Sequence, residues 1–398
     1  MEVTASPGSK GAIADRLAET RQRTLELIEP LDDEQLNRIY SPILSPLAWD
    51  LGHIANFEEL WLVQTIGGRE ALHGDLGRFY DAIENPRDIR GELPILRGEE
   101  LRRYLAEVRV RTLEVLDEVE LAEGAAADPL LREGFVYEML IAHEQQHNET
   151  MLQLLMMIDG YELPAACGPG GGAGHLPPGQ APGQLARRFE YPPVREMPRT
   201  PDAIRVAGGR DEIGAPPTGF AYDNERPRHT VELAAFEIDP IPVTNGEYAD
   251  FVGETGAEPP LYWERDSAGG WLHTAMGRRD PLDPGVPVVH VSWHEADAFA
   301  RWAGKRLPTE QEWEAARPEL LAVGQVWEWT ASDFVAYPGF EPFPYREYSE
   351  PFFGDGYKVL RGGSWATSPN VMRPSFRNWD LPQRRQIFAG LRCARDAS

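Results

Sequence analysis

A glycine- and proline-rich segment near the middle of the chain divides it into two parts of different composition. Residues 163–195 include the run Cys167-Gly-Pro-Gly-Gly-Gly-Ala-Gly, which can neither hold a helix nor bury much apolar area. Before this segment, apolar residues recur at three- and four-residue steps, as in amphipathic helices. After it, brief apolar stretches alternate with Trp, Gly and Pro. We therefore expect two domains, residues 1–162 and 196–398, joined by a linker.

Charge and cysteine content narrow the class of protein. The 398 residues include 39 basic and 64 acidic ones, which gives a formal net charge of −25 and opposes binding to nucleic acid or to an anionic membrane. Small-molecule substrates are favoured. Two cysteines imply no disulfide framework. Because the chain has no basic and apolar leader and no run of about 18 apolar residues, we expect a cytoplasmic protein; nothing indicates its oligomeric state.

The first part predicts an up-down bundle of four long helices. These cover residues 11–30, the segment around His53, residues 98–121 and residues 128–159. In the second part periodicity predicts one clear helix, Trp293 to Gly304, within an α+β domain that buried aromatic side chains stabilise more than regular sheet does.

Two histidines lie four residues apart in the fourth predicted helix. His143 and His147 therefore share a face, with Cβ atoms roughly 5–6 Å apart, so both imidazoles can reach one metal ion. If the helices pack antiparallel, His53 faces the pair and completes a three-nitrogen site with open positions for substrate. The spacing does not choose between zinc and iron. The alternative is that these are ordinary packed or solvated histidines.

An irregular stretch, Gly67 to Pro94, carries two arginines three residues apart. Arg87 and Arg90 present planar guanidinium groups suited to carboxylates, in a loop of the kind where ligand contacts concentrate. The alternative is a solvated surface pair.

Recognisable local motifs fill the second part. They are Pro242-Val-Thr-Asn-Gly-Glu-Tyr248, Pro287-Val-Val-His-Val-Ser-Trp293, Arg306-Leu-Pro-Thr-Glu-Gln-Glu-Trp-Glu314, Val326-Trp-Glu-Trp-Thr330, Arg361-Gly-Gly-Ser-Trp365 and Gly390-Leu-Arg-Cys-Ala-Arg395. Together they resemble the formylglycine-generating enzymes, whose domain is an irregular fold of the C-type-lectin kind. The helical part, with its three histidines, resembles the DinB-like bundles. This order of domains resembles that of the ergothioneine-type sulfoxide synthases, which join a thiol to an imidazole carbon with O2.

The resemblance implies a metal and roles for several residues. His53, His143 and His147 would hold non-haem Fe(II), and O2 would be a co-substrate. Gln146 would contact the imidazole of hercynine, the Nα-trimethyl betaine of histidine, because an amide suits a neutral ring nitrogen. A structural Ca2+ in the second domain is left open.

Further substrate contacts are implied in the second domain. Asn378 and Trp379 would recognise the quaternary ammonium group, which needs oxygen atoms and an aromatic face. Asp380 would bind the ammonium group of the thiol, and Arg87 with Arg90 its carboxylates. Formylglycine-generating enzymes use a cysteine pair; here Phe388 replaces one member, so we expect Cys393 to be a small buried apolar residue.

A tyrosine would direct the reaction towards carbon–sulfur bond formation. A thiol with O2 can instead give a sulfinic acid, so a synthase needs a placed proton donor, and a tyrosine hydroxyl donates without being charged. Tyr337, Tyr345 and Tyr348 lie in one Pro-rich segment. Since the family's catalytic tyrosine is followed three residues later by another near the site, the resemblance implies that Tyr345 is catalytic and Tyr348 binds substrate.

We therefore expect a sulfoxide synthase acting on hercynine and a cysteine-containing thiol. γ-Glutamylcysteine is favoured over cysteine because two arginines match its two carboxylates. The alternatives are a selenoneine- or ovothiol-type synthase, a zinc- or nickel-dependent DinB-type thiol transferase, and a non-catalytic binding module.

Overall fold

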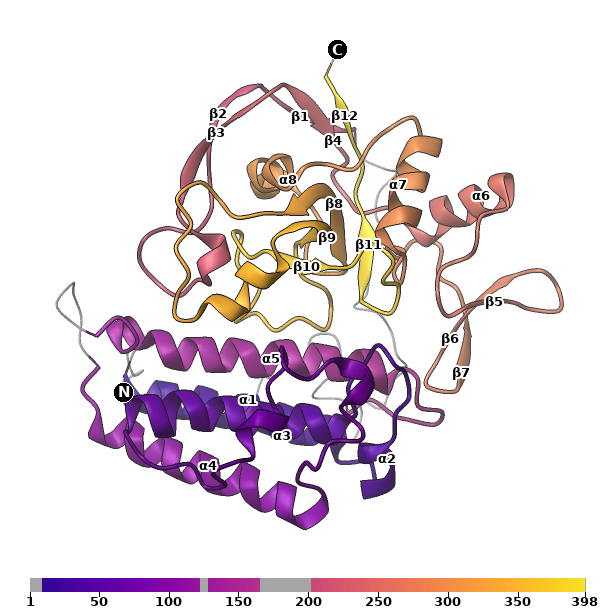
Figure 1. Cartoon of the computed structure of the whole chain (residues 1–398). Helices are drawn as coiled ribbons and strands as arrows, with labels where there is room; N and C mark the ends of the chain where they lie inside the picture. Colours follow the sequence, from indigo (N-terminus) through magenta and orange to yellow (C-terminus); the bar gives the residue numbers. More distant parts are fainter. Residues whose placement is uncertain (1–8, 122–127, 165–201, 398) are drawn as a thin grey trace, which may run out of the picture. The chain divides into compact units, whose positions relative to one another are not determined.

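The computed structural model describes residues 9–121, 128–164 and 202–397. The chain divides into two compact units between residues 167 and 168 (Figure 1). The predicted linker lies almost wholly outside the described residues, so the predicted domain bounds of 1–162 and 196–398 stay predictions. Within the described ranges, no helix is both long and apolar enough to cross a membrane.

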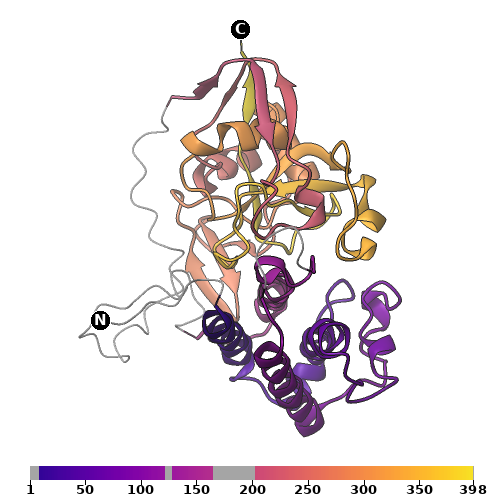
Figure 2. The ribbon, with the colours of Figure 1, turned by 90° about the vertical axis from the view of Figure 1, so that its left-hand side faces the viewer.

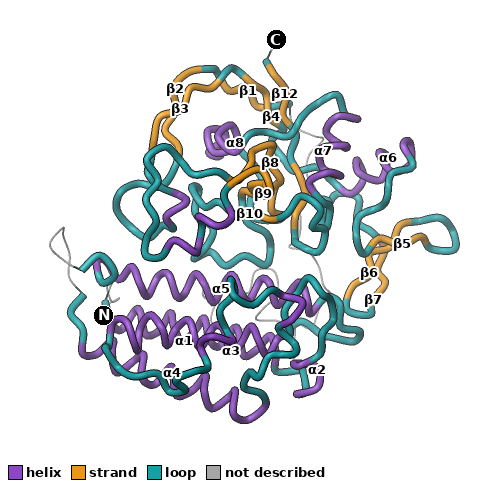
Figure 3. The backbone as a smooth tube through the Cα atoms, viewed as in Figure 1, coloured by secondary structure: helices purple, strands orange, loops and turns teal. Residues whose placement is uncertain are grey.

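Four long helices form the first unit, as predicted, and lie side by side (Figure 3). They are α1 (Lys10–Ile28), α3 (Leu47–Glu58), α4 (Gly98–Glu118) and α5 (Phe135–Leu155), with the short α2 (Asp33–Asn37) between the first two. α1 packs against α5, while α3 packs against both α4 and α5. Figure 2 views several of these helices end-on. The arrangement agrees with the predicted helical bundle.

The spacing of the buried residues explains which side of α1 packs against the other helices. Its buried positions recur every three or four residues: Ile13, Leu17, Thr20, Thr24 and Leu27. Ser9 begins the helix, since its side chain accepts a hydrogen bond from the backbone N–H of Ala12, a common N-cap arrangement.

The helix that carries two of the histidines begins later than predicted. Residues 128–134 were expected to belong to it, but Glu133 (φ 53°) and Gly134 (φ 73°) have left-handed backbone conformations. These conformations interrupt a right-handed helix, so α5 begins at Phe135. The helix that carries His53, α3, continues after Glu58 into a π-helical segment, Glu59–Ile66. This rare geometry is frequent at functional sites.

The second unit has short strands and much irregular structure (Figure 3). Its largest sheet has the order β10-β9-β8-β11, in which β11 pairs parallel to β8 and the other pairs are antiparallel. The strands of this sheet are β8 (Trp327–Phe334), β9 (Gly354–Arg361), β10 (Asn378–Asp380) and β11 (Ala389–Leu391). The smaller sheets contain β1 (Ile204–Val206), β4 (Phe236–Ile238) and β12 (Ala394–Asp396); β2 (Gly209–Ile213) and β3 (His229–Leu233); and β5 (Trp263–Arg265), β6 (Trp271–Ala275) and β7 (Arg278–Pro281).

Two helices of this unit were not predicted. Besides the expected α7 (Trp293–Trp302), the structure has α6 (Asn245–Thr255) and α8 (Glu310–Ala316). Both begin with a capping box, in which the side chain of the residue before the helix and a glutamate three residues later bond each other's backbone. These capping boxes are visible in the sequence and could have predicted the two helices.

Buried ion pairs help the aromatic core to hold the irregular segments together. Arg377 and Arg392 are both 0% exposed. Arg377 donates two hydrogen bonds to Glu310 at 2.7 and 2.8 Å, and Arg392 donates two to Glu328 at 2.7 Å each. Because a buried charge is costly unless it is paired and hydrogen-bonded, these pairs tie together segments more than 60 residues apart.

Candidate metal centre and substrate-binding residues

Three histidines from two helices of the first unit lie together. His53 on α3 is buried, and His143 and His147 on α5 are half-buried. One nitrogen of each lies within 4.8 Å of the others, and the Nε2 atoms of His53 and His143 are 3.2 Å apart. Among the described residues, this is the only group of His, Cys, Asp and Glu side chains close enough to hold a metal ion. The predicted meeting of these side chains is therefore seen in the structure.

A hydrogen bond orients the His53 ring, and a carboxylate lies near the ring of His147. Nδ1 of His53 lies 2.6 Å from the carbonyl oxygen of Tyr80, so that nitrogen carries the proton and Nε2 keeps its lone pair. Nδ1 of His147 lies 3.3 Å from Oδ1 of the buried Asp50. Carbonyl or carboxylate partners of this kind fix the tautomer of metal-binding histidines.

Burial and a neighbouring ring keep the imidazoles of His53 and His143 neutral. Burial, followed by the nearby His147, holds the pKa of both His53 and His143 well below the ordinary 6.5. A neutral imidazole is the form that binds a metal. A donor set of three imidazole nitrogens fits a divalent first-row transition metal.

Aromatic rings stack on two of the histidines, and Arg90 packs on one of these rings. Phe57 stacks on His143 at a centroid distance of 3.9 Å, and Trp49 stacks on His53 at 4.8 Å. The guanidinium carbon of Arg90 lies 3.7 Å from the centroid of the Trp49 ring.

Arg90 is 6% exposed, and its nitrogens donate to Asn85 O, Ser45 Oγ and Ala82 O. This geometry favours a positioning role for Arg90 in place of the predicted contact with a thiol carboxylate. Arg87, in contrast, is exposed and stays a candidate for that contact.

The polar residues between the two histidines of α5 have structural partners. Glu144 accepts hydrogen bonds from Arg21 Nε and Thr24 Oγ1, each at 2.7 Å. Arg21 and Arg109 also donate to Glu58, which gives a buried network that links α1, α3, α4 and α5. Burial opposes ionisation of Glu58, but Arg109 and Arg21 outweigh it and lower the pKa of this carboxyl below its ordinary value. Gln146, the predicted contact for the imidazole of hercynine, is half-buried beside His147.

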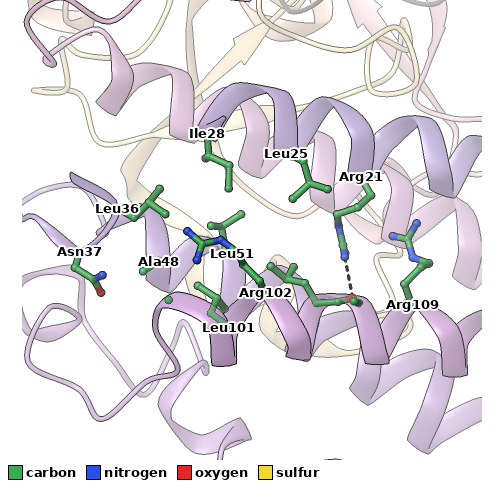
Figure 4. Close-up of a pocket in the computed structure, with 13 residues that line it drawn as sticks. Arg21, Leu25, Ile28, Leu36, Asn37, Ala48, Leu51, Leu101, Arg102 and Arg109 are labelled. Atoms are coloured by element: carbon green, nitrogen blue, oxygen red, sulfur yellow. Dashed lines mark hydrogen bonds between the residues drawn. The ribbon is translucent and has the colours of Figure 1, made fainter. Parts of the chain in front are cut away.

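A separate cavity of about 390 Å3 lies in the same unit (Figure 4). From α3 it is lined by Ala48 and Leu51, which the helical period places on the side away from His53. The arginines at its wall, Arg21 and Arg109, are paired with glutamates. This cavity is therefore not part of the three-histidine site.

In the second unit, the predicted substrate residues form an edge strand. Asn378, Trp379 and Asp380 make up β10 and are all half-buried. Trp379 stacks on Phe334 at a centroid distance of 4.2 Å, and the Tyr348 ring meets it edge-on at 5.6 Å. Asp380 lies 3.4 Å from Arg384 Nε, so an ion-pair partner already stands beside the carboxylate predicted to bind a thiol ammonium group.

The three candidate tyrosines have different environments. Tyr345 and Tyr348 are half-buried and meet edge-on at 6.2 Å, whereas Tyr337 is 4% exposed and its hydroxyl lies 3.4 Å from Glu310. Burial first, then Tyr222 and Asp223, raise the pKa of Tyr345 well above 10. Tyr345 is therefore a neutral hydroxyl donor, and Tyr337 belongs to the buried ion-pair network.

Cys393 is buried (1% exposed) and free, as predicted. Burial raises the pKa of its thiol to about 12, so it is unreactive at neutral pH.

Four residues that contact or act on predicted site residues of their own unit were not predicted from the sequence. Asp50 precedes His53 by three residues, a spacing that places both on one side of α3, so this signal was available. Tyr80, Tyr222 and Asp223 act through contacts with residues distant in the chain, and no local pattern marks them.

Comparisons with known proteins agree with this two-part architecture. Residues 16–151 match the DinB superfamily, and residues 188–318 and 322–397 match the sulfatase-modifying factor enzyme 1-like domain. The chain is 37% identical to a protein named hercynine oxygenase from Mycolicibacterium smegmatis, over 98% of this chain and 99% of that protein. It is 38% identical to a hercynine oxygenase from Mycobacterium tuberculosis, over 96% and 98%.

A partial match covers about half of the chain. The formylglycine-generating enzyme of Streptomyces coelicolor is 30% identical over 53% of this chain and 95% of that protein. The two hercynine oxygenases instead match both parts in their order along the chain, which confirms the resemblance drawn from the motifs. The chain therefore belongs to the hercynine oxygenase family.

Proposed function

We propose that the protein is an Fe(II)- and O2-dependent sulfoxide synthase that joins hercynine to a cysteine-containing thiol in ergothioneine biosynthesis. One thiol, one hercynine and one O2 give one sulfoxide and one water. One oxygen atom goes to sulfur, and the other leaves as water with the hydrogens of the S–H and imidazole C–H bonds. The observation that carries this proposal is the set of three imidazole nitrogens within 4.8 Å, in a chain whose near full-length relatives are named hercynine oxygenases.

The histidines would hold the metal through nitrogens that their neighbours leave available. Because Tyr80 O accepts from Nδ1 of His53 and Asp50 stands near Nδ1 of His147, Nε2 would be the ligand atom at both. Iron bound there would bring the thiol and O2 together beside the imidazole carbon. Phe57 and Trp49, stacked on two of the rings, would hold them in orientation and keep water away.

Substrate recognition would follow the charges of the two molecules. The amide of Gln146 would pair with an imidazole nitrogen of hercynine. The face of Trp379 and the side chain of Asn378 would meet its quaternary ammonium group. Arg87 would bind a carboxylate of the thiol, which we propose is γ-glutamylcysteine, with cysteine as the competing donor.

Tyr345 would supply the proton that separates synthesis of the sulfoxide from simple oxidation of the thiol. The competing reaction needs only thiol and O2 and gives a sulfinic acid. Because the pKa of Tyr345 is raised by burial and by its neighbours, its hydroxyl stays protonated and can donate.

The direct test is incubation of Fe(II)-loaded protein in air with hercynine and either γ-glutamylcysteine or cysteine. Mass spectrometry should show a product equal in mass to hercynine plus thiol plus two oxygen atoms minus one water. The ratio of kcat/KM for the two thiols should favour γ-glutamylcysteine. Zinc-loaded protein and anaerobic samples are the controls. If neither thiol gave the adduct, or if zinc-loaded protein formed it without O2, the proposal would fail in favour of a thiol transferase.

A further inference from the structure

A buried turn in the second unit contacts both segments that carry its proposed functional residues. The turn is a 3-10 helix, Asp223–Glu225, which directly follows Tyr222. Asp223, Asn224 and Glu225 are 4%, 1% and 0% exposed. Burying two carboxylates and an amide is costly unless each is hydrogen-bonded, so their partners show what the turn does.

The first set of partners belongs to the segment that carries Tyr345 and Tyr348. Asp223 accepts a short hydrogen bond from the hydroxyl of Ser349, and its other carboxylate oxygen accepts one from the backbone N–H of Phe343 at 3.4 Å. The side chain of Asn224 donates to Ser349 Oγ at 3.0 Å. The turn thus holds the residues at both ends of the segment 343–349.

Aromatic rings add to the contact between the turn and the tyrosine segment. Tyr222 stacks on Tyr348 at a centroid distance of 4.1 Å and an interplanar angle of 17°. Tyr345 meets Tyr348 edge-on, and both Tyr222 and Asp223 act electrostatically on the Tyr345 hydroxyl. A shift of the turn would therefore displace the segment 343–349 and Tyr345 with it.

The second set of partners belongs to the segment that leads into β10. Glu225 accepts hydrogen bonds from Arg373 at 2.6 Å and from Ser375 Oγ at 2.7 Å. The backbone carbonyl of Asn224 accepts one from Arg377 at 2.8 Å. Arg377 immediately precedes Asn378, the first residue of β10. The turn therefore also fixes the position at which the strand with Asn378 and Trp379 begins.

We propose that Asp223 is a positioning residue for Tyr345, within a turn that sets the tyrosine segment and the Asn378–Trp379 strand in one arrangement. This inference rests on the proposed function, since it assigns Asp223 a role in directing that reaction towards the sulfoxide. The carboxylate is required because it accepts hydrogen bonds on both oxygens, whereas an amide offers a single acceptor oxygen.

The test compares two variants of the full-length, Fe(II)-loaded protein. Asp223→Asn keeps the side-chain size but loses one acceptor and the charge, and Ser349→Ala removes one of the hydrogen bonds to Asp223 without changing any charge. In both, the ratio of sulfoxide to sulfinic acid should fall, by about 10- to 100-fold in Asp223→Asn, the scale expected for a small misplacement of a catalytic group. The iron content and the KM for hercynine should stay within about twofold of the unsubstituted protein.

The matched control is Asp239→Asn. Asp239 is half-buried in the same unit and accepts from Lys305 at 2.7 Å, so its substitution likewise replaces a hydrogen-bonded carboxylate with an amide. This control should lose stability without changing the product ratio. If Asp223→Asn does not fold, Ser349→Ala decides the question.

An unchanged product ratio in the folded variants would overturn the positioning role, and so would an equal change in Asp239→Asn. Failure of the unsubstituted protein to form any sulfoxide would instead count against the proposed function, so the two failures are distinguishable.

Discussion

Asp50 Oδ1 lies 3.3 Å from Nδ1 of His147, which connects α3 to the helix that carries the other two histidines. Asp50 is 2% exposed and stands three residues before His53 on α3. One helix therefore provides both a predicted ligand and a buried carboxylate beside another predicted ligand. We therefore expect the predicted metal site to depend on this helix pair and not on three independent side chains.

Removal of the Asp50 carboxylate should weaken metal binding. In Asp50→Asn, His147 loses a charged partner for Nδ1, and the affinity for Fe(II) should fall about 10- to 100-fold, as is typical for the loss of a residue that orients a ligand. Anaerobic Fe(II) titration measures this. Asp117→Asn, at an exposed position of α4, is the control and should bind iron normally. Equal affinities in the two variants would contradict the role of Asp50.

Gly52 should not tolerate a side chain, although it lies inside a helix. A Cβ added there would lie 2.2 Å from Cζ of Tyr80, whose ring is 1% exposed. Helix propensity alone predicts that Ala stabilises this position by about 1 kcal/mol. We expect Gly52→Ala to destabilise the fold by about 1–3 kcal/mol through overpacking.

The same substitution should lower iron affinity, because the carbonyl oxygen of Tyr80 contacts Nδ1 of His53. Denaturant unfolding and iron titration test the two effects. Gly11→Ala is the matched control, since a Cβ added there on α1 meets nothing within 4 Å. A Gly52→Ala protein that is more stable than the unsubstituted protein, with normal iron affinity, would disprove this account of Tyr80.

Tyr345→Phe should change which product forms. The ring is kept and the hydroxyl is lost, so sulfoxide formation should fall about 100- to 10,000-fold, the usual range for a general acid, while O2-dependent oxidation of the thiol persists or rises. Product analysis by mass spectrometry measures both. Tyr337→Phe is the control, because Tyr337 is buried near Glu310 and its loss should affect only stability. A Tyr345→Phe protein with the normal product ratio would exclude this role and redirect attention to Tyr348.

Arg87 and Arg90 should behave differently when replaced. Arg87→Ala should raise the KM for the thiol about tenfold and leave the KM for hercynine unchanged, because only a thiol carboxylate loses its partner. Arg90→Ala should mainly weaken iron binding, since Arg90 packs on Trp49, which stacks on His53. Steady-state kinetics with each substrate varied in turn separates the two. A hercynine defect as large as the thiol defect in Arg87→Ala would argue against its assignment.

The features that the sequence predicted best are those encoded locally. The spacing of His143 and His147 fixes a shared helical face, and apolar periodicity marks the four long helices. The start of α5 was misplaced because the apolar pattern does not reveal the left-handed backbone conformation at Glu133. The short α6 and α8 were not predicted because helices of 11 and 7 residues carry little periodicity, although their capping boxes were visible.

The contacts that orient the site could not be predicted from local pattern. Tyr80 contacts His53 from 27 residues away, and Asp223 contacts Ser349 from 126 residues away. Arg90 was expected to bind a thiol carboxylate because it lies in an irregular loop and carries a planar guanidinium group suited to carboxylates. The structure instead buries it against Trp49, which depends on how the loop folds back onto α3.

The most direct test of the central claim is the dependence of sulfoxide formation on iron bound by the three histidines. Metal-free protein is titrated anaerobically with Fe(II), supplied with hercynine and γ-glutamylcysteine, and exposed to air, and the product is then quantified by mass spectrometry. Loss of one of three ligands in His147→Ala should abolish iron retention with a modest loss of bundle stability. We predict that sulfoxide yield in the unsubstituted protein rises until one iron is bound per chain, and that His147→Ala retains no iron and forms no sulfoxide. Full sulfoxide formation by His147→Ala, or by metal-free protein, would contradict the account.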